Sequence, residues 1–372
     1  MCLCASLTAC HSGKDSGTKA MHNNNTTSAI SDVKINDLKP VSEDYKFPEV
    51  HISGHAAIEE KINTVLQLDL LEHLPGVFKK DPFETVMPQQ DNYSGTTSIY
   101  GWKQLRTNPN VLSLSVDGEA TGAYSEGFTT YYNFDLRNGD RITLKDLFTE
   151  EGLKSITKEL NQHVKKELED FIASAKNNAA SQKQSDEDRE NTEEQIAMYE
   201  DCLSGALDYE AGYYSFYFSN DSLVFERGRC SNHAMQALDD LDRFDIPMAV
   251  TALEDYMTPY GKGLIAGNDG PGSSSPEWKL YKGSINGQYP IRAIIKEVND
   301  DGSLSMSYWY EKKRIPIEWS GTFKGQHFSL KEAGGDAETA TVEADWKEGK
   351  ITGTWTNIKT KKQMTLTLET YQ

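Results

Sequence analysis

The chain has 372 residues, of which 37% are hydrophobic and 26% are charged, and its formal net charge is −19. This composition is that of a water-soluble globular protein with room for two domains. Residues 1–276 contain 24 basic and 44 acidic residues, whereas residues 277–372 contain 14 and 13, so nearly all of the net charge lies in the first part. A surface that acidic repels phosphate backbones, which argues against nucleic acid as a partner and favours a basic one.

The N-terminal sequence Leu7-Thr-Ala-Cys10 has the pattern of a bacterial lipobox, an apolar residue and two small residues before a cysteine. We predict that residues 1–9 are the remnant of a signal peptide, which requires small residues before its cleavage site. The true start is expected upstream, because the nine residues before Cys10 include no basic residue and are too few for a full signal. Acylated Cys10 would hold the protein on a membrane, outside the cytoplasm, in the bacterial cell envelope. The alternative is that Cys2, Cys4 and Cys10 are incidental.

Residues 10–45 are predicted to form a lipidated, flexible tether. They consist mainly of small and polar residues, including Asn23-Asn-Asn-Thr-Thr27. Such a segment cannot bury enough apolar surface to offset its conformational entropy. Because no later stretch approaches the roughly 18 consecutive apolar residues of a membrane helix, the lipid is the only membrane anchor that we predict.

Helical and strand patterns alternate between the tether and a turn-rich run that begins at Gly267. Residues 55–71, 152–175 and 192–206 show the apolar spacing of amphipathic helices, with Thr192 as a cap for the last one. Alternating segments predict strands at 97–106, 111–119, 129–136, 213–218 and 222–226. The highly charged segment 181–194 is interpreted as an exposed or disordered connection.

Two cysteines remain in this region if residues 1–9 are removed and Cys10 carries a lipid: Cys202 and Cys230. Outside the cytoplasm two such cysteines often form a disulfide, and closing the loop between them would stabilise the fold by about 3 kcal/mol. The alternative is two buried, unpaired thiols.

Residues 266–276 are rich in glycine, serine and proline and are predicted to be a linker. Residues 277–372 then contain about eight strand-length segments separated by turn signals, with glycines at recurring strand positions such as Gly283, Gly321 and Gly353. This pattern predicts an all-β antiparallel meander that closes as an eight-stranded barrel. The Gly353-Thr-Trp355 signature is similar to those of lipocalin and avidin barrels. Four tryptophans are expected inside it, in a filled core rather than around a ligand: Trp309, Trp319, Trp346 and Trp355.

Residues 46–265 resemble a known family through their order of motifs. The motifs are Val111-Leu-Ser-Leu-Ser-Val116, Gly122-Ala-Tyr-Ser-Glu-Gly127, Tyr131-Tyr-Asn-Phe-Asp-Leu136, Asn138-Gly-Asp140, Ile142-Thr-Leu-Lys-Asp-Leu-Phe148, Ser222-Leu-Val-Phe225 and Asp245-Ile-Pro247. They resemble the extracytoplasmic domain of lysozyme-sensing anti-sigma factors and the N-terminal part of a peptidoglycan deacetylase.

The resemblance implies an α+β fold, with a twisted antiparallel sheet packed against helices, and a role in recognition. The binding residues that it implies are Tyr124, Glu126, Gly127 and Phe128. The family usually has Gly-Gly-Ala-His where this chain has Ser125-Glu-Gly-Phe128, so no role that depends on an imidazole carries over.

No catalytic motif is found, and we predict no catalytic residues, no cofactor and no metal site. His51 and His55 have the only metal-like spacing, and Ser53-Gly54 between them disfavours a helix. The preferred hypothesis is a non-catalytic binding or sensing module for an envelope component, such as peptidoglycan, a glycan or a cationic protein like lysozyme. The alternative is an envelope hydrolase that uses acidic residues of the first domain.

Overall fold

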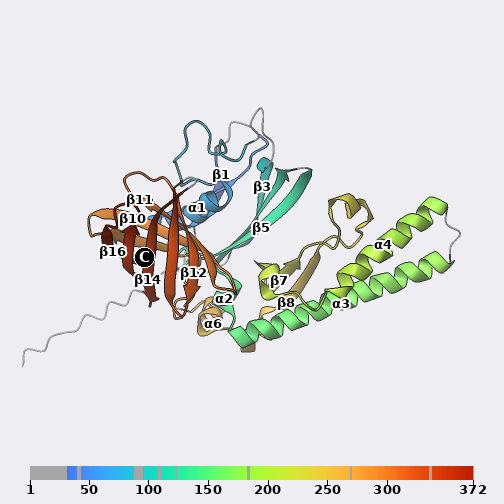
Figure 1. Cartoon of the computed structure of the whole chain (residues 1–372). Helices are drawn as coiled ribbons and strands as arrows, with labels where there is room; N and C mark the ends of the chain where they lie inside the picture. The colour runs from blue at the N-terminus through green and yellow to red at the C-terminus, as the bar shows by residue number, and fades with distance from the viewer. Residues whose placement is uncertain are drawn as a thin grey trace, which may run out of the picture.

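A computed structural model describes residues 32–39, 43–87, 95–107, 110–122, 124–181, 185–268, 270–334 and 337–371. Small sheets and helices form an α+β region, and a closed barrel follows it in the chain (Figure 1). Both parts of the predicted fold class are confirmed. The predicted signal remnant, Cys10 and most of the predicted tether lie outside the described residues.

The first sheet pairs β1 (Val33–Asp37) with β2 (Pro48–Ile52), and α1 (Ala56–Leu70) follows it. The Asn63 amide of α1 accepts a hydrogen bond from the Val50 N–H at 2.9 Å and donates one to the Val50 carbonyl at 2.7 Å. These two hydrogen bonds to the backbone of Val50 connect α1 to β2. Because β1 lies within residues 10–45, the folded region starts earlier than the predicted end of the tether at residue 45.

The second sheet is an antiparallel meander with the order β3-β4-β5. Its strands are β3 (Thr96–Thr107), β4 (Val111–Thr121) and β5 (Ser125–Asp135). The ring of Phe128 on β5 covers Gly118 on β4 so closely that a Cβ atom at Gly118 would overlap it. Glycine at this position lets the end of the ring approach the neighbouring strand closely.

A long helical hairpin extends away from this sheet (Figure 1). Its elements and the short helix before them are α2 (Leu144–Leu147), α3 (Glu150–Ser181) and α4 (Asp186–Ser204). Helix α4 begins at Asp186, within the segment that we expected to be an irregular connection. Ser185 accepts a hydrogen bond from the Asp188 N–H at 3.1 Å, and the acidic first turn interacts favourably with the helix dipole.

The third sheet has the order β6-β7-β8, so the described residues of this region form three small sheets, where the family resemblance implied one. Its elements are η1 (Ala211–Tyr213), β6 (Ser215–Ser219), β7 (Ser222–Arg227), η2 (His233–Leu238), β8 (Phe244–Ala249), α5 (Val250–Leu253), η3 (Glu254–Tyr256) and α6 (Pro259–Ala266). Side chains connect it to the second sheet. The Asn133 amide donates to the Phe216 carbonyl at 2.8 Å, and the Phe218 N–H donates to Ser113 Oγ at 3.2 Å.

Cys202 on α4 and Cys230 before η2 form a disulfide, with their Cα atoms 5.6 Å apart. The bond attaches the helical hairpin to the segment that follows β7. The structure therefore contains the predicted disulfide between Cys202 and Cys230.

The C-terminal strands form a closed antiparallel barrel in which β16 pairs with β9. The strands are β9 (Leu280–Ile285), β10 (Tyr289–Val298), β11 (Ser303–Tyr310), β12 (Ile317–Lys324), β13 (His327–Gly334), β14 (Ala337–Lys347), β15 (Lys350–Asn357) and β16 (Gln363–Thr370). A Cβ atom at Gly283 would overlap the carbonyl oxygen of Thr367 on β16, so glycine permits the close approach that closes the barrel.

One carboxylate, Glu332, is buried in the barrel, and its side chain accepts hydrogen bonds from four donors. They are Tyr308 at 2.6 Å, Thr339 at 2.7 Å, Trp355 at 3.0 Å and Trp319 at 3.1 Å. Burial alone would raise the pKa of Glu332, but the hydrogen bonds outweigh it and hold the pKa below its ordinary value.

The prediction that Trp309 lies inside the barrel is wrong. Its side chain belongs to the core of the α+β region, together with Leu280 and Ile294. At the same interface Arg292 pairs with Glu60 at 2.6 Å, and Tyr371 donates to Glu60 at 3.2 Å. The barrel is therefore packed against the α+β region through both apolar and charged contacts.

Candidate functional site

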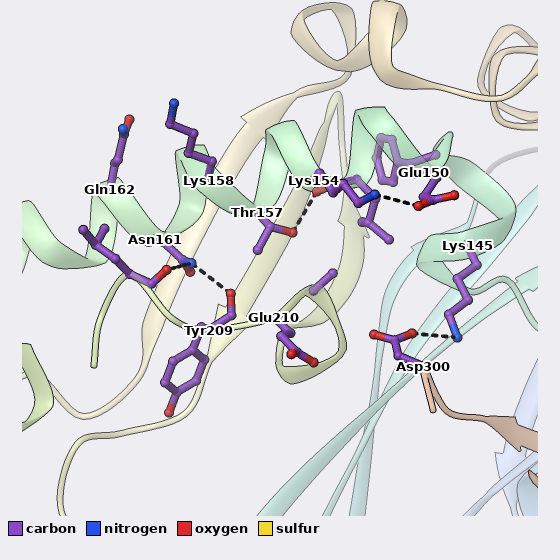
Figure 2. A pocket seen from close by; sticks show the side chains of 14 residues that line it. Lys145, Glu150, Lys154, Thr157, Lys158, Asn161, Gln162, Tyr209, Glu210 and Asp300 are labelled. Atoms are coloured by element: carbon purple, nitrogen blue, oxygen red, sulfur yellow. Dashed lines mark hydrogen bonds and ion pairs between the residues drawn. The ribbon is translucent and has the colours of Figure 1, made fainter. Parts of the chain in front are cut away.

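A groove with a volume of about 950 Å³ runs along the first half of α3 (Figure 2). One side is α3 itself, the second is the loop between α4 and η1, and the end nearest the barrel is formed by the α2 segment and the turn between β10 and β11. The lining residues are Lys145, Phe148, Glu150, Leu153, Lys154, Thr157, Lys158, Asn161, Gln162, Leu207, Tyr209, Glu210, Ala211 and Asp300.

The loop wall is fixed to α3 by the buried side chain of Asn161. Its amide nitrogen donates to the carbonyls of Leu207, at 3.1 Å, and Tyr209, at 2.9 Å. Its amide oxygen accepts a hydrogen bond from the Tyr214 hydroxyl at 2.6 Å. One amide thus holds the loop at two of its carbonyls, and we expect the groove to be formed before any ligand binds.

Behind the same wall lies Arg227, whose side chain is 1% exposed. Its guanidinium carbon is 3.4 Å from the centroid of the Tyr209 ring, and one nitrogen donates to the Ala206 carbonyl at 3.3 Å. No acidic residue in the described ranges pairs with this guanidinium within salt-bridge distance. The cation–π contact therefore offsets part of the cost of burying the charge and fixes the Tyr209 ring in the wall of the groove.

Ion pairs occupy the end of the groove nearest the barrel. Lys154 donates to Glu150 at 2.6 Å, and this hydrogen bond lowers the pKa of Glu150 and raises that of Lys154. Lys145 lies 3.2 Å from Glu277 and 3.8 Å from Asp300. Because Asp300 belongs to a barrel turn, this end of the groove is made by both regions of the chain.

The four binding residues predicted from the family resemblance lie outside this groove, at and near the tip of the β4–β5 hairpin. Tyr124 is 69% exposed and stacks on His233, with ring centroids 4.8 Å apart. Glu126 accepts hydrogen bonds from Arg229 and, at 3.1 Å, from His233, and these bonds lower its pKa. An imidazole is therefore present at the tip, although it comes from a distant part of the sequence.

Phe128 and Gly127 have different surroundings. The Phe128 ring is partly buried against the core of the α+β region, with its centroid 6.1 Å from that of Tyr100. Gly127 pairs with Glu119 in the β4–β5 ladder. The structure thus brings Tyr124 and Glu126 together in one surface cluster and assigns Phe128 to internal packing. Binding by these four residues stays a prediction.

Within the described residues, no group of three or more His, Cys, Asp or Glu side chains is arranged to hold a metal ion. His51 instead lies 3.5 Å from Glu49 and 3.6 Å from Glu59. None of the helices in the described ranges is long and apolar enough to cross a membrane.

No protein-family model matches the chain, and no curated protein matches it significantly. Among solved structures, it has a distant similarity to a member of the DUF3298 family from Bacteroides fragilis. The two share 16% sequence identity over 60% of this chain and 86% of that one, with a TM-score of 0.37. A similarity at this level establishes neither a common fold nor a common function.

Proposed function

We propose that this protein is a non-catalytic binding module of the bacterial cell envelope, and that its groove binds an extended segment of an envelope polymer, in the first place peptidoglycan. The observation that carries this proposal is the groove itself, with its volume of about 950 Å³. Apolar side chains such as Leu153 and Leu207 line it together with polar groups from two sides, the mixture typical of ligand sites.

The hydrolase alternative is less well supported by the same groove. A general acid that protonates a glycosidic oxygen needs a raised pKa. The pKa of Glu150 is lowered by Lys154, which is the opposite of what that role requires. We therefore do not propose Glu150 as the general acid of a hydrolase.

The proposed location depends on Cys10, which lies outside the described residues. If Cys10 is acylated, Cys10→Ser in the full-length gene with its native start will move the protein from the detergent phase to the aqueous phase on phase separation. Unchanged partitioning would contradict the lipid anchor but would not contradict the proposed binding role of the groove.

Sedimentation with purified peptidoglycan sacculi tests the proposed function. Thr157→Trp places a large side chain in the groove, whereas Ser155→Trp changes an exposed residue of α3 that is not part of the lining. We expect the parent and Ser155→Trp to sediment with sacculi and Thr157→Trp to bind at least tenfold more weakly. Absence of sedimentation by the parent would overturn the proposal, and release of soluble fragments during incubation would favour the hydrolase.

A cationic protein such as lysozyme is a second candidate partner, favoured by the charge of α4. The helix carries one basic residue, Arg189, and eight acidic ones: Asp186, Glu187, Asp188, Glu190, Glu193, Glu194, Glu200 and Asp201. Charges of this kind act mainly on association and are screened by salt. Surface plasmon resonance should then show saturable lysozyme binding whose association slows as salt is raised.

Tyr124 is a better test residue for that partner than Phe128, because removing the Phe128 ring also removes core packing. If Tyr124 anchors the complex, Tyr124→Ala will shorten its lifetime and weaken binding by about 2 kcal/mol or more. Lack of saturable binding at low salt, or unchanged binding by Tyr124→Ala, would reject lysozyme as the partner.

A further inference from the structure

Two charged side chains of the groove have no partner of their own. The lysines nearest the barrel are paired, as described above, whereas Lys158 and Glu210 form no ion pair and no side-chain hydrogen bond with any residue in the described ranges. Lys158 belongs to α3 and Glu210 to the loop wall, so the groove separates them (Figure 2). One positive and one negative charge are therefore available to a bound molecule, on different sides of the site.

This distribution of charge selects among ligands. A neutral glycan would use neither charge, a purely anionic ligand would be repelled by Glu210, and a purely cationic one would be repelled by Lys158. A molecule with both a carboxylate and an ammonium group can form an ion pair on each side. The charges thus favour a zwitterionic ligand that spans the groove.

The uncharged groups of the groove fit a peptide. The Gln162 amide and the Tyr209 hydroxyl have no hydrogen-bond partner among the described residues. An amide both donates and accepts, as a peptide group does, and a hydroxyl can do either. Ala211 and the exposed side chain of Leu207 provide apolar contact for small aliphatic side chains.

We propose that the groove recognises the peptide portion of the envelope polymer, in the form of a short peptide with both a free carboxylate and a free ammonium group. This inference rests on the proposed function, because it assigns a ligand class to the same groove. Lys158 pairs with the ligand carboxylate, and Glu210 pairs with the ligand ammonium group.

Calorimetric titration of the full chain tests the inference with three probes prepared from peptidoglycan: the disaccharide-peptide, the disaccharide without peptide and the free peptide. We expect the disaccharide-peptide and the free peptide to bind, and the disaccharide alone to bind at least tenfold more weakly. Lys158→Gln and Glu210→Gln should each weaken peptide binding about threefold to fivefold, the range of partly exposed ion pairs. Two charge-removing controls outside the groove, Lys165→Gln on α3 and Glu190→Gln on α4, should leave affinity unchanged.

The outcomes separate this inference from the proposed function. If sacculi bind and the disaccharide without peptide binds as tightly as the disaccharide-peptide, the peptide inference is wrong and the proposed function stands. Unchanged affinity in both Lys158→Gln and Glu210→Gln also rejects the inference. If neither sacculi nor any of the three probes binds, both proposals are wrong.

Discussion

The barrel and the α+β region use polar side chains in different ways. Inside the barrel, Glu332 is 7% exposed and receives hydrogen bonds from four donors, so its carboxylate is fully engaged by the protein. In the groove, Lys158 and Glu210 have no partner among the described residues. The two regions also differ in net charge: residues 277–372 are nearly neutral, whereas residues 1–276 carry most of the negative charge. The Glu332 carboxylate thus stabilises the interior of the barrel, whereas Lys158 and Glu210 in the groove of the α+β region remain available for recognition.

The largest effect that we expect concerns Glu332. Glu332→Ala leaves Tyr308, Trp319 and Trp355 without their common acceptor, and loss of one partner from such a buried group costs about 3–5 kcal/mol. Chemical denaturation should show this loss, while Glu332→Gln, which keeps an acceptor oxygen, should lose less. Equal stability of Glu332→Ala and the parent would remove the contrast between the two regions.

The same carboxylate predicts a pH dependence. Because the folded state holds the pKa of Glu332 below its ordinary value, its contribution is complete above the pKa of the unfolded state. It is lost as pH falls through the folded-state pKa. Acid titration of stability should therefore be shallower in Glu332→Gln than in the parent, and identical profiles would contradict the assignment.

The disulfide gives the next largest effect. The cysteines are 28 residues apart, and closing a loop of this length stabilises a fold by about 3–4 kcal/mol in the chain-entropy picture. Cys202→Ser with Cys230→Ser should lower the free energy of unfolding by about that amount, measured by denaturation. Non-reducing peptide mapping of the purified protein should find the two cysteines joined, and free thiols at both positions would reject the pairing.

Asn161→Ala tests whether the groove depends on its loop wall. The change removes three hydrogen bonds at a buried position and should cost about 2 kcal/mol of stability. It should also weaken sacculus binding under conditions in which the variant is still fully folded, because the loop is no longer fixed. Asn161→Asp keeps an acceptor for the Tyr214 hydroxyl, so its stability and its binding should be intermediate between those of the parent and those of Asn161→Ala. Full binding by folded Asn161→Ala would show that the loop wall is not needed.

The smallest single effect that we expect is that of Arg292→Gln, at the interface between the two regions. Arg292→Gln removes partly exposed ion pairs with Glu60 and Glu311, each of which is worth about 1 kcal/mol or less. Trp309→Ala removes apolar packing at the same interface and should cost several times more, about 3 kcal/mol or above. A larger effect from Arg292→Gln than from Trp309→Ala would mean that charge, and not apolar packing, joins the regions.

Local patterns predicted the barrel well. Alternating side chains and turn residues define its strands, and glycines such as Gly283 stand where neighbouring strands approach closely. The long helix α3 also followed from its apolar spacing. Strand β1 was missed because Val33 and Ile35 are its only apolar residues and they follow a long polar segment. The start of α4 was missed because its acidic residues suggested an exposed, irregular segment. At a helix N-terminus, however, acidic residues stabilise the helix through its dipole.

The groove could not be predicted, because it depends on contacts between distant residues. Asn161 gives a weak signal as a polar residue beside an apolar helical face, but its partners lie 46 and 48 residues away. The cluster at the tip of the β4–β5 hairpin could not be predicted for the same reason, since His233 and Glu126 are 107 residues apart. The family resemblance identified the tip residues but not the elements that meet them.

Closure of the barrel has a consequence for how the chain reaches its folded state. Because β9 is bonded to β16, Leu366 must find Ile285 before the barrel is complete, and the first strand of the barrel waits for the last. Until β16 has been synthesised, β9 and β15 each keep an edge able to pair with other chains. If the protein is exported, as proposed above, keeping the C-terminal region unfolded until after translocation would prevent these edges from pairing with other chains during synthesis.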